Sequence, residues 1–105
     1  MSEVKPNEPT LAVSRLPVTR LTGDDVRDFV AGLVQEVCDV APDAITDTAR
    51  IDHELAMESV QMVQIQVALE QEFDVTLDFL EILRLNAFGP IADYIHRQIL
   101  EQHTA

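Results

Sequence analysis

The sequence predicts an all-α domain, a four-helix bundle with three main helices, one short helix and a long first loop. Of the 105 residues, 47% are apolar but only 5% are aromatic, so the core must be aliphatic. An aliphatic core favours helices packed on helices. Apolar residues also recur every three or four positions in three segments, as they do along one face of a helix. A chain of this length holds one hydrophobic core.

The chain begins with a stretch that carries no helical pattern. Three prolines, Pro6, Pro9 and Pro17, interrupt it, and its charges are mixed. Such a stretch rarely buries enough apolar surface to order itself. We therefore expect residues 1–21 to be a flexible tail and residues 22–105 to form the folded domain.

The first helix is expected from about Asp24 to Asp39, with Thr22 or Asp24 as its cap. Its apolar face consists of Val26, Phe29, Val30, Leu33 and Val37. The stretch that follows, up to Met57, is long and irregular, and Pro42 stops the helix or starts a short turn. We expect widely spaced apolar residues to pin this loop to the core: Ile45, Ile51 and Leu55.

The second helix has the strongest pattern and is expected from about Ser59 to Phe73. Ser59 suits either the N-cap or the first turn, because its hydroxyl can accept a hydrogen bond from a backbone N–H. A core stripe consists of Met62, Ile65, Leu69 and Phe73. A second apolar stripe consists of Val60, Val63 and Val67.

Two further helices complete the prediction. A short helix is expected from about Phe79 to Leu85. The last helix is expected from about Pro90 to Glu101, because proline suits the first turn of a helix. It should bury Ile91, Tyr94, Ile95 and Ile99.

The charge of the chain limits its partners. There are 19 acidic and seven basic residues, a formal net charge of −12. This charge repels phosphate backbones and anionic lipid surfaces, so we expect neither nucleic-acid nor membrane binding. It would draw the chain towards basic patches on partner proteins. No apolar run is long enough for a signal peptide or a membrane span, and we expect a soluble, cytoplasmic monomer.

The sequence offers little for catalysis or metal binding. Cys38 is the only cysteine, so no internal disulfide or cysteine metal cluster can form, and we expect it to pack in the core. A hydrolase built on Ser59, His53 and Asp52 is disfavoured, because the Gly-x-Ser-x-Gly elbow is missing. The acidic residues lack the spacing of a calcium loop. We expect no catalytic residues and no metal site, with His96 and His103 in solvent.

One short motif points to a function. The segment Leu55-Ala56-Met57-Glu58-Ser59-Val60 resembles the attachment motif of acyl carrier proteins, which usually reads Asp-Ser-Leu after a leucine and a small residue. The resemblance continues in residues 68–75, at the helix end and the turn, and in residues 91–95, at the start of the last helix. In all it covers roughly residues 24–100, with residues 22–105 as the carrier domain.

The resemblance implies what Ser59 does. A phosphopantetheinyl transferase would attach a 4′-phosphopantetheine arm from coenzyme A to its hydroxyl, and the arm would hold acyl groups as thioesters. The expected partners are therefore this transferase and acyl-transferring or condensing enzymes, such as a ketosynthase or an acyltransferase. The position also makes physical sense, since the N-terminus of a helix favours a phosphodiester. The start at Met1 suggests a free-standing protein or an excised part of one.

Two departures from the family pattern bear on the partners. Glu58 replaces the usual aspartate, which changes the reach of the carboxylate. The second helix is less acidic than in many relatives, so we expect partners to dock on apolar and amide side chains, with the Glu58 carboxylate at the rim. The apolar and amide residues are Val60, Gln61, Val63, Gln64, Val67 and Gln71. These features favour a carrier for polyketide or related secondary-metabolite biosynthesis.

Other interpretations stay open. The chain could be a fatty-acid carrier, or an unmodified helical interaction module in which Ser59 serves only as a helix cap. A peptidyl carrier is disfavoured, because Ala56-Met57 stands in place of the Gly-Gly that usually precedes the motif.

Overall fold

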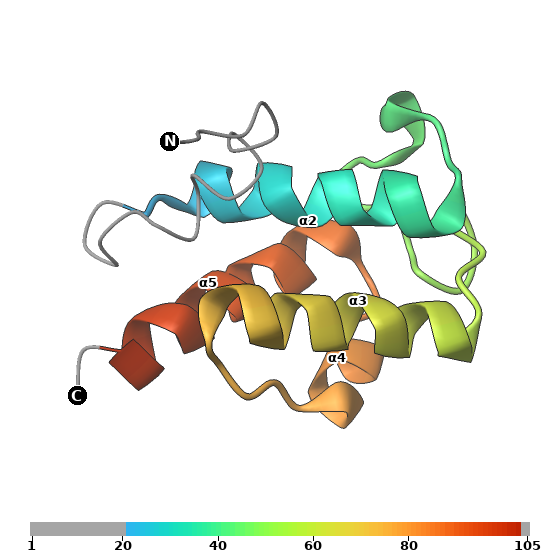
Figure 1. Ribbon diagram of the computed structural model, residues 1–105. Coiled ribbons are helices and arrows are strands. Elements are labelled where there is room, and N and C mark those ends of the chain that lie inside the picture. The colour runs from blue at the N-terminus through green and yellow to red at the C-terminus, as the bar shows by residue number, and fades with distance from the viewer. Residues whose placement is uncertain (1–20, 104–105) are drawn as a thin grey trace, which may run out of the picture.

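A computed structural model describes residues 21–103 and confirms the all-α prediction (Figure 1). Four α-helices and one 3₁₀ turn follow in order within these residues: α2 (Gly23–Cys38), η2 (Pro42–Ala44), α3 (Ser59–Phe73), α4 (Phe79–Leu85) and α5 (Phe88–His103). Helix α2 packs against both α3 and α5, and the short α4 packs against α5. The predicted tail over residues 1–21 lies outside the described residues except for Leu21, which is buried in the core.

The helix ends show why the sequence folds into these segments. Thr22 caps α2, as predicted: its hydroxyl accepts from Asp25 N–H at 3.1 Å, and the Asp25 carboxylate accepts from Thr22 N–H at 3.0 Å. The helices α2, α3 and α4 each end in a left-handed residue that is not glycine, namely Asp39, Asp74 and Asn86. Aspartate and asparagine tolerate this conformation better than other side chains.

Helix α5 begins two residues before the predicted start, and the long loop explains the difference. Phe88 N–H donates to Ala49 O at 2.9 Å, and Gly89 N–H donates to Asp47 O at 2.9 Å. The loop carbonyls thus satisfy N–H groups that the first turn leaves without helical partners. A Cβ at Gly89 would lie 3.1 Å from Asp47 O, a tight contact that glycine avoids at this close approach.

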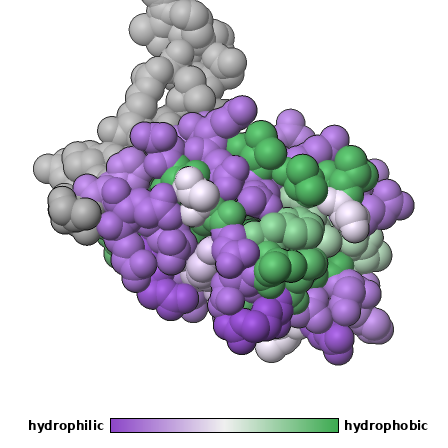
Figure 2. All heavy atoms as spheres, turned by 90° about the horizontal axis from the view of Figure 1, so that it is seen from below, coloured by the Kyte–Doolittle hydropathy of each residue, from purple (hydrophilic) through white to green (hydrophobic). Residues whose placement is uncertain are grey.

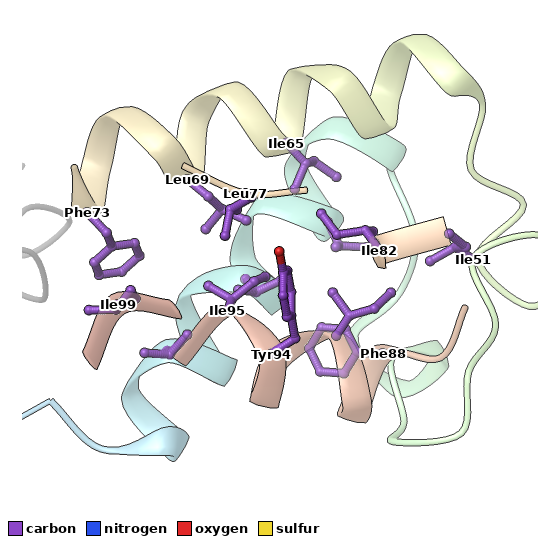
Figure 3. Close-up of a cluster of buried hydrophobic side chains, with 14 of the residues drawn as sticks. Ile51, Ile65, Leu69, Phe73, Leu77, Ile82, Phe88, Tyr94, Ile95 and Ile99 are labelled. Carbon is purple, nitrogen blue, oxygen red and sulfur yellow. The ribbon is translucent and has the colours of Figure 1, made fainter. Parts of the chain in front are cut away.

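Between the helices lies the expected aliphatic core. Ile65, Leu69 and Phe73 of α3 point towards Ile95 and Ile99 of α5 (Figure 3). The loop anchors Ile51 and Leu55 are buried and Ile45 is partly buried, as predicted. The core therefore holds the long loop against the helices and fixes where α3 can begin.

The two histidines of α5 contact backbone carbonyl groups, and one of them corrects an expectation. His96 is half-buried, and its Nε2 lies 3.1 Å from Leu21 O. His103 Nε2 lies 2.8 Å from Phe73 O and 2.9 Å from Asp74 O. Both rings lie within hydrogen-bond distance of backbone carbonyls of neighbouring segments. The prediction that His96 lies in solvent is wrong, whereas His103 is exposed, as predicted.

Candidate functional site

Ser59 is the first residue of α3, and its side chain is exposed. The N-cap is Glu58, whose backbone is extended with φ −83° and ψ 158°. Ser59 therefore occupies the first turn, and the interpretation of Ser59 as the cap is wrong. No hydrogen bond joins the Ser59 side chain to any other group in residues 21–103. Its hydroxyl is accessible to another molecule.

The end of the loop holds the serine in place through its backbone. Leu55 N–H donates to Arg50 O at 3.0 Å, and Met57 N–H donates to Ile51 O at 2.8 Å. Between them Ala56 adopts φ 46°, the left-handed region that costs an L-residue about 1–2 kcal/mol. The buried Leu55 side chain anchors this turn, so Ala56 reverses the chain just before α3.

The neighbouring carboxylate Glu54 belongs to the same turn. Its Oε1 accepts from Arg50 N–H at 2.8 Å. This bond lowers the pKa of Glu54 below its usual value, aided by the Glu54 backbone and by His53, whose Nδ1 lies 3.2 Å from Glu54 Oε2. His53 is exposed and pairs with Glu54, and no contact joins it to Ser59. The hydrolase alternative thus lacks its serine–histidine contact.

The predicted docking residues divide into two groups. Glu58, Gln64 and Gln71 are exposed, as are the three valines Val60, Val63 and Val67. Gln61 instead is half-buried: its Oε1 accepts from Glu58 N–H at 2.8 Å, and its Nε2 donates to Val37 O at 3.4 Å. Gln61 is thus committed to bonds within the chain.

The exposed valines continue onto α4. Val60 is 58% exposed, and on α4 Leu80 is 72% exposed and Leu83 is 38% exposed. Seen from below, the molecule shows hydrophobic residues gathered on this side (Figure 2). Sequence reasoning did not include the α4 residues among the docking residues. The signal was their spacing of three on the side of α4 opposite the buried Ile82.

A small apolar cavity of about 40 Å³ lies inside the bundle. Side chains from the loop, from α2 to α5 and around the start of α3 line it, among them Leu55, Met57, Met62, Ile82 and Phe88. Gln66 is the one polar side chain in its lining, and its Nε2 donates to Leu77 O at 3.1 Å. The lining of the cavity is thus almost entirely apolar.

The start of α3 has features that suit a covalently attached phosphodiester. The first turn of a 15-residue helix offers free N–H groups and the positive end of the helix dipole beside the exposed Ser59. Within residues 21–103, no three histidine, cysteine or acidic side chains gather as metal ligands would. None of the helices described there has the length and apolar content needed to cross a membrane.

Comparisons with known proteins give the same answer. Residues 28–95 match the family described as phosphopantetheine attachment site. An acyl carrier protein of Campylobacter fetus is 33% identical over 70 residues, covering 67% of this chain and 91% of its own. An acyl carrier protein of Campylobacter curvus is 31% identical over 74 residues, covering 70% of this chain and 91% of its own. An acyl carrier protein of Cyanidioschyzon merolae is 27% identical over 85 residues, covering 79% of this chain and 93% of its own.

The chain therefore belongs to the acyl carrier protein family. Members of this family hold a covalently attached 4′-phosphopantetheine group and carry acyl groups, so the chain is a carrier and not an enzyme. As a family they work with phosphopantetheinyl transferases and acyl-handling enzymes.

Proposed function

We propose that Ser59 carries the 4′-phosphopantetheine arm, and that the chain holds acyl intermediates on it as thioesters. One observation supports this choice most directly: Ser59 is the only serine in the matched residues 28–95. It is also exposed at the start of α3, where its oxygen can form the new bond to phosphorus. The pyrophosphate bond of coenzyme A breaks, the adenosine bisphosphate leaves, and the hydroxyl proton passes to solvent.

The test is intact-protein mass spectrometry after incubation with coenzyme A and a broad-specificity phosphopantetheinyl transferase. We expect the wild type to gain one phosphopantetheine group and Ser59→Ala to gain none. Ser14→Ala is the matched control, since Ser14 lies outside the matched residues, and it should be modified like the wild type. Modification of Ser59→Ala would contradict the proposal.

If the wild type gains nothing, Glu58 decides between two explanations. Glu58→Asp restores the usual residue of the motif, and modification of that variant would indicate a transferase that requires the shorter carboxylate. A variant that still gains nothing would favour the second candidate function, an unmodified interaction module. The exposed valines of α3 are the feature that favours this candidate.

We further propose that the acyl groups belong to polyketide or related secondary-metabolite biosynthesis, with a ketosynthase or an acyltransferase as partner. The reason is the less acidic surface beside Ser59, where Val60, Val63 and Val67 are exposed among Gln64 and Gln71. The loaded carrier should therefore support condensation by a polyketide ketosynthase faster than by a fatty-acid ketosynthase. The reverse order would assign it to fatty-acid synthesis.

The docking residues can be tested by removing apolar character without changing shape. Val63→Thr places a hydroxyl on the exposed α3 surface and should raise the KM of the partner enzyme for the carrier. Val40→Thr makes the same change in the loop after α2, at a valine partly buried against the core, and serves as the control once its urea midpoint is shown to match that of Val63→Thr. Equal KM values for the two variants would remove Val63 from the docking surface.

A further inference from the structure

Gln61 joins three parts of the molecule with one side chain. It is the third residue of α3, and its carbonyl oxygen accepts from the N–H of Glu58, the residue directly before Ser59. Its amide nitrogen donates to Val37 O, in the last turn of α2. The last carbonyls of a helix have no partner within the helix, so the Gln61 amide fills one of these positions.

We infer that Gln61 is a positioning residue for the modification of Ser59: it fixes the peptide between Met57 and Glu58, just before the serine, against the end of α2. This inference rests on the proposed attachment at Ser59. Gln61 contacts no reacting atom, and it acts through the backbone on either side of the serine. Upstream, the bond from Met57 N–H to Ile51 O holds the other end of the same short segment.

The chemistry of the side chain matters here. Only a group with both an acceptor and a donor can bond Glu58 N–H and Val37 O together, and an amide has both. A glutamate at this position can accept from Glu58 N–H but cannot donate to Val37 O. An alanine can do neither. Comparing glutamine, glutamate and alanine at position 61 therefore tests the two hydrogen bonds one at a time.

A transferase must meet the Ser59 hydroxyl in one geometry. Without the Gln61 side chain, Glu58 N–H would bond to water instead, because Glu58 is exposed to solvent. The backbone before Ser59 then samples several conformations, and only a fraction of the molecules has the conformation that the transferase can bind. The apparent affinity falls by that fraction, so KM rises while kcat stays the same. We expect Gln61→Ala to raise the KM for the carrier about tenfold, within the loss that small misplacements cause.

The test uses the unmodified full chain as wild type, Gln61→Ala, Gln61→Glu and Gln64→Ala. Gln64 is the matched control, a glutamine on the exposed side of the same helix. Amide exchange measured by NMR should be about tenfold faster at Glu58 in Gln61→Ala, and unchanged in Gln61→Glu and Gln64→Ala. The KM of the transferase should rise in Gln61→Ala, rise less in Gln61→Glu and stay the same in Gln64→Ala.

Each result has a defined meaning. Unchanged exchange at Glu58 in Gln61→Ala would overturn the inference, because the exchange is read without any enzyme. Faster exchange with an unchanged KM would overturn it as well, since the ordering would then not matter to the transferase. A raised KM with unchanged exchange would assign Gln61 to direct docking. If neither the wild type nor Glu58→Asp is ever modified at Ser59, the proposed function is refuted, and the inference with it.

Discussion

Ala56, at the turn before Ser59, offers a quantitative test of how the loop is held. Its φ of 46° lies in the left-handed region, which costs an L-residue about 1–2 kcal/mol. Ala56→Gly removes this cost, and the residue is exposed, so little packing is lost. Glycine also gives the unfolded chain more conformational freedom, which lowers the free energy of unfolding by about 0.4–1 kcal/mol. The free energy of unfolding should therefore increase by roughly 0.5–1 kcal/mol.

Urea unfolding of the unmodified protein measures this difference. The midpoint should rise with no change in the slope m, and the Tm should rise by about 2–8 °C for a domain of this size. Ala68→Gly makes the same substitution inside α3, where it should instead cost about 1 kcal/mol. An unchanged or lower midpoint for Ala56→Gly would show that the left-handed turn stores no strain, and would refute the reasoning.

Three further predictions concern the packing around the site. Tyr94→Phe removes the hydroxyl that accepts from Asp78 N–H at 2.9 Å, and should lower the free energy of unfolding by about 1–2 kcal/mol in urea. Arg27→Ala removes a cation 5.2 Å above the Phe88 ring and an ion pair to the loop, and should cost about 1–2 kcal/mol, less at high salt. Burial raises the pKa of Cys38 above that of an ordinary thiol, so in the unmodified protein this sole thiol should react slowly with a disulfide reagent at pH 7 and faster as the pH rises.

Each of these predictions has its own control and contradiction. Faster amide exchange at Asp78 should accompany the loss of stability in Tyr94→Phe, and an unchanged rate would place the effect elsewhere. Arg97→Ala changes an exposed arginine on α5 and should stay within about 0.5 kcal/mol of the wild type. If the rate at which Cys38 reacts with the disulfide reagent stopped rising near pH 8, the result would contradict the raised pKa. The denatured protein serves as the reference for an accessible thiol.

Much of the fold could be predicted because apolar spacing and helix capping are local. The bounds of α3 and α4 agree with the predicted Ser59–Phe73 and Phe79–Leu85, and the long loop is pinned through the anchors expected for it. The packing of Cys38 also agrees, since the residue is partly buried against the core. The start of α5 was missed because carbonyl groups far away in the loop satisfy its first N–H groups.

The candidate site also combines features that are local in the sequence with features that depend on distant contacts. The motif around Ser59 and its position at a helix start can be recognised in the sequence alone. Which residue caps the helix could not be decided, because serine suits both the N-cap and the first turn, and it is the loop backbone that places Glu58 at the N-cap. The role of Gln61 was also hidden, since a glutamine on a helix surface and one that bonds a second helix have the same spacing.

By itself, the sequence determined the class of fold, the order of the helices and the serine that we propose is modified. These features depend on the periodicity of apolar side chains and on a short contiguous motif. The tertiary structure alone decided which side chains face solvent and which ones bond distant backbone: Leu80 of α4 is exposed, whereas Gln61 is turned towards α2. Such contacts depend on where two helices cross, and that geometry is set by the packing of the whole core.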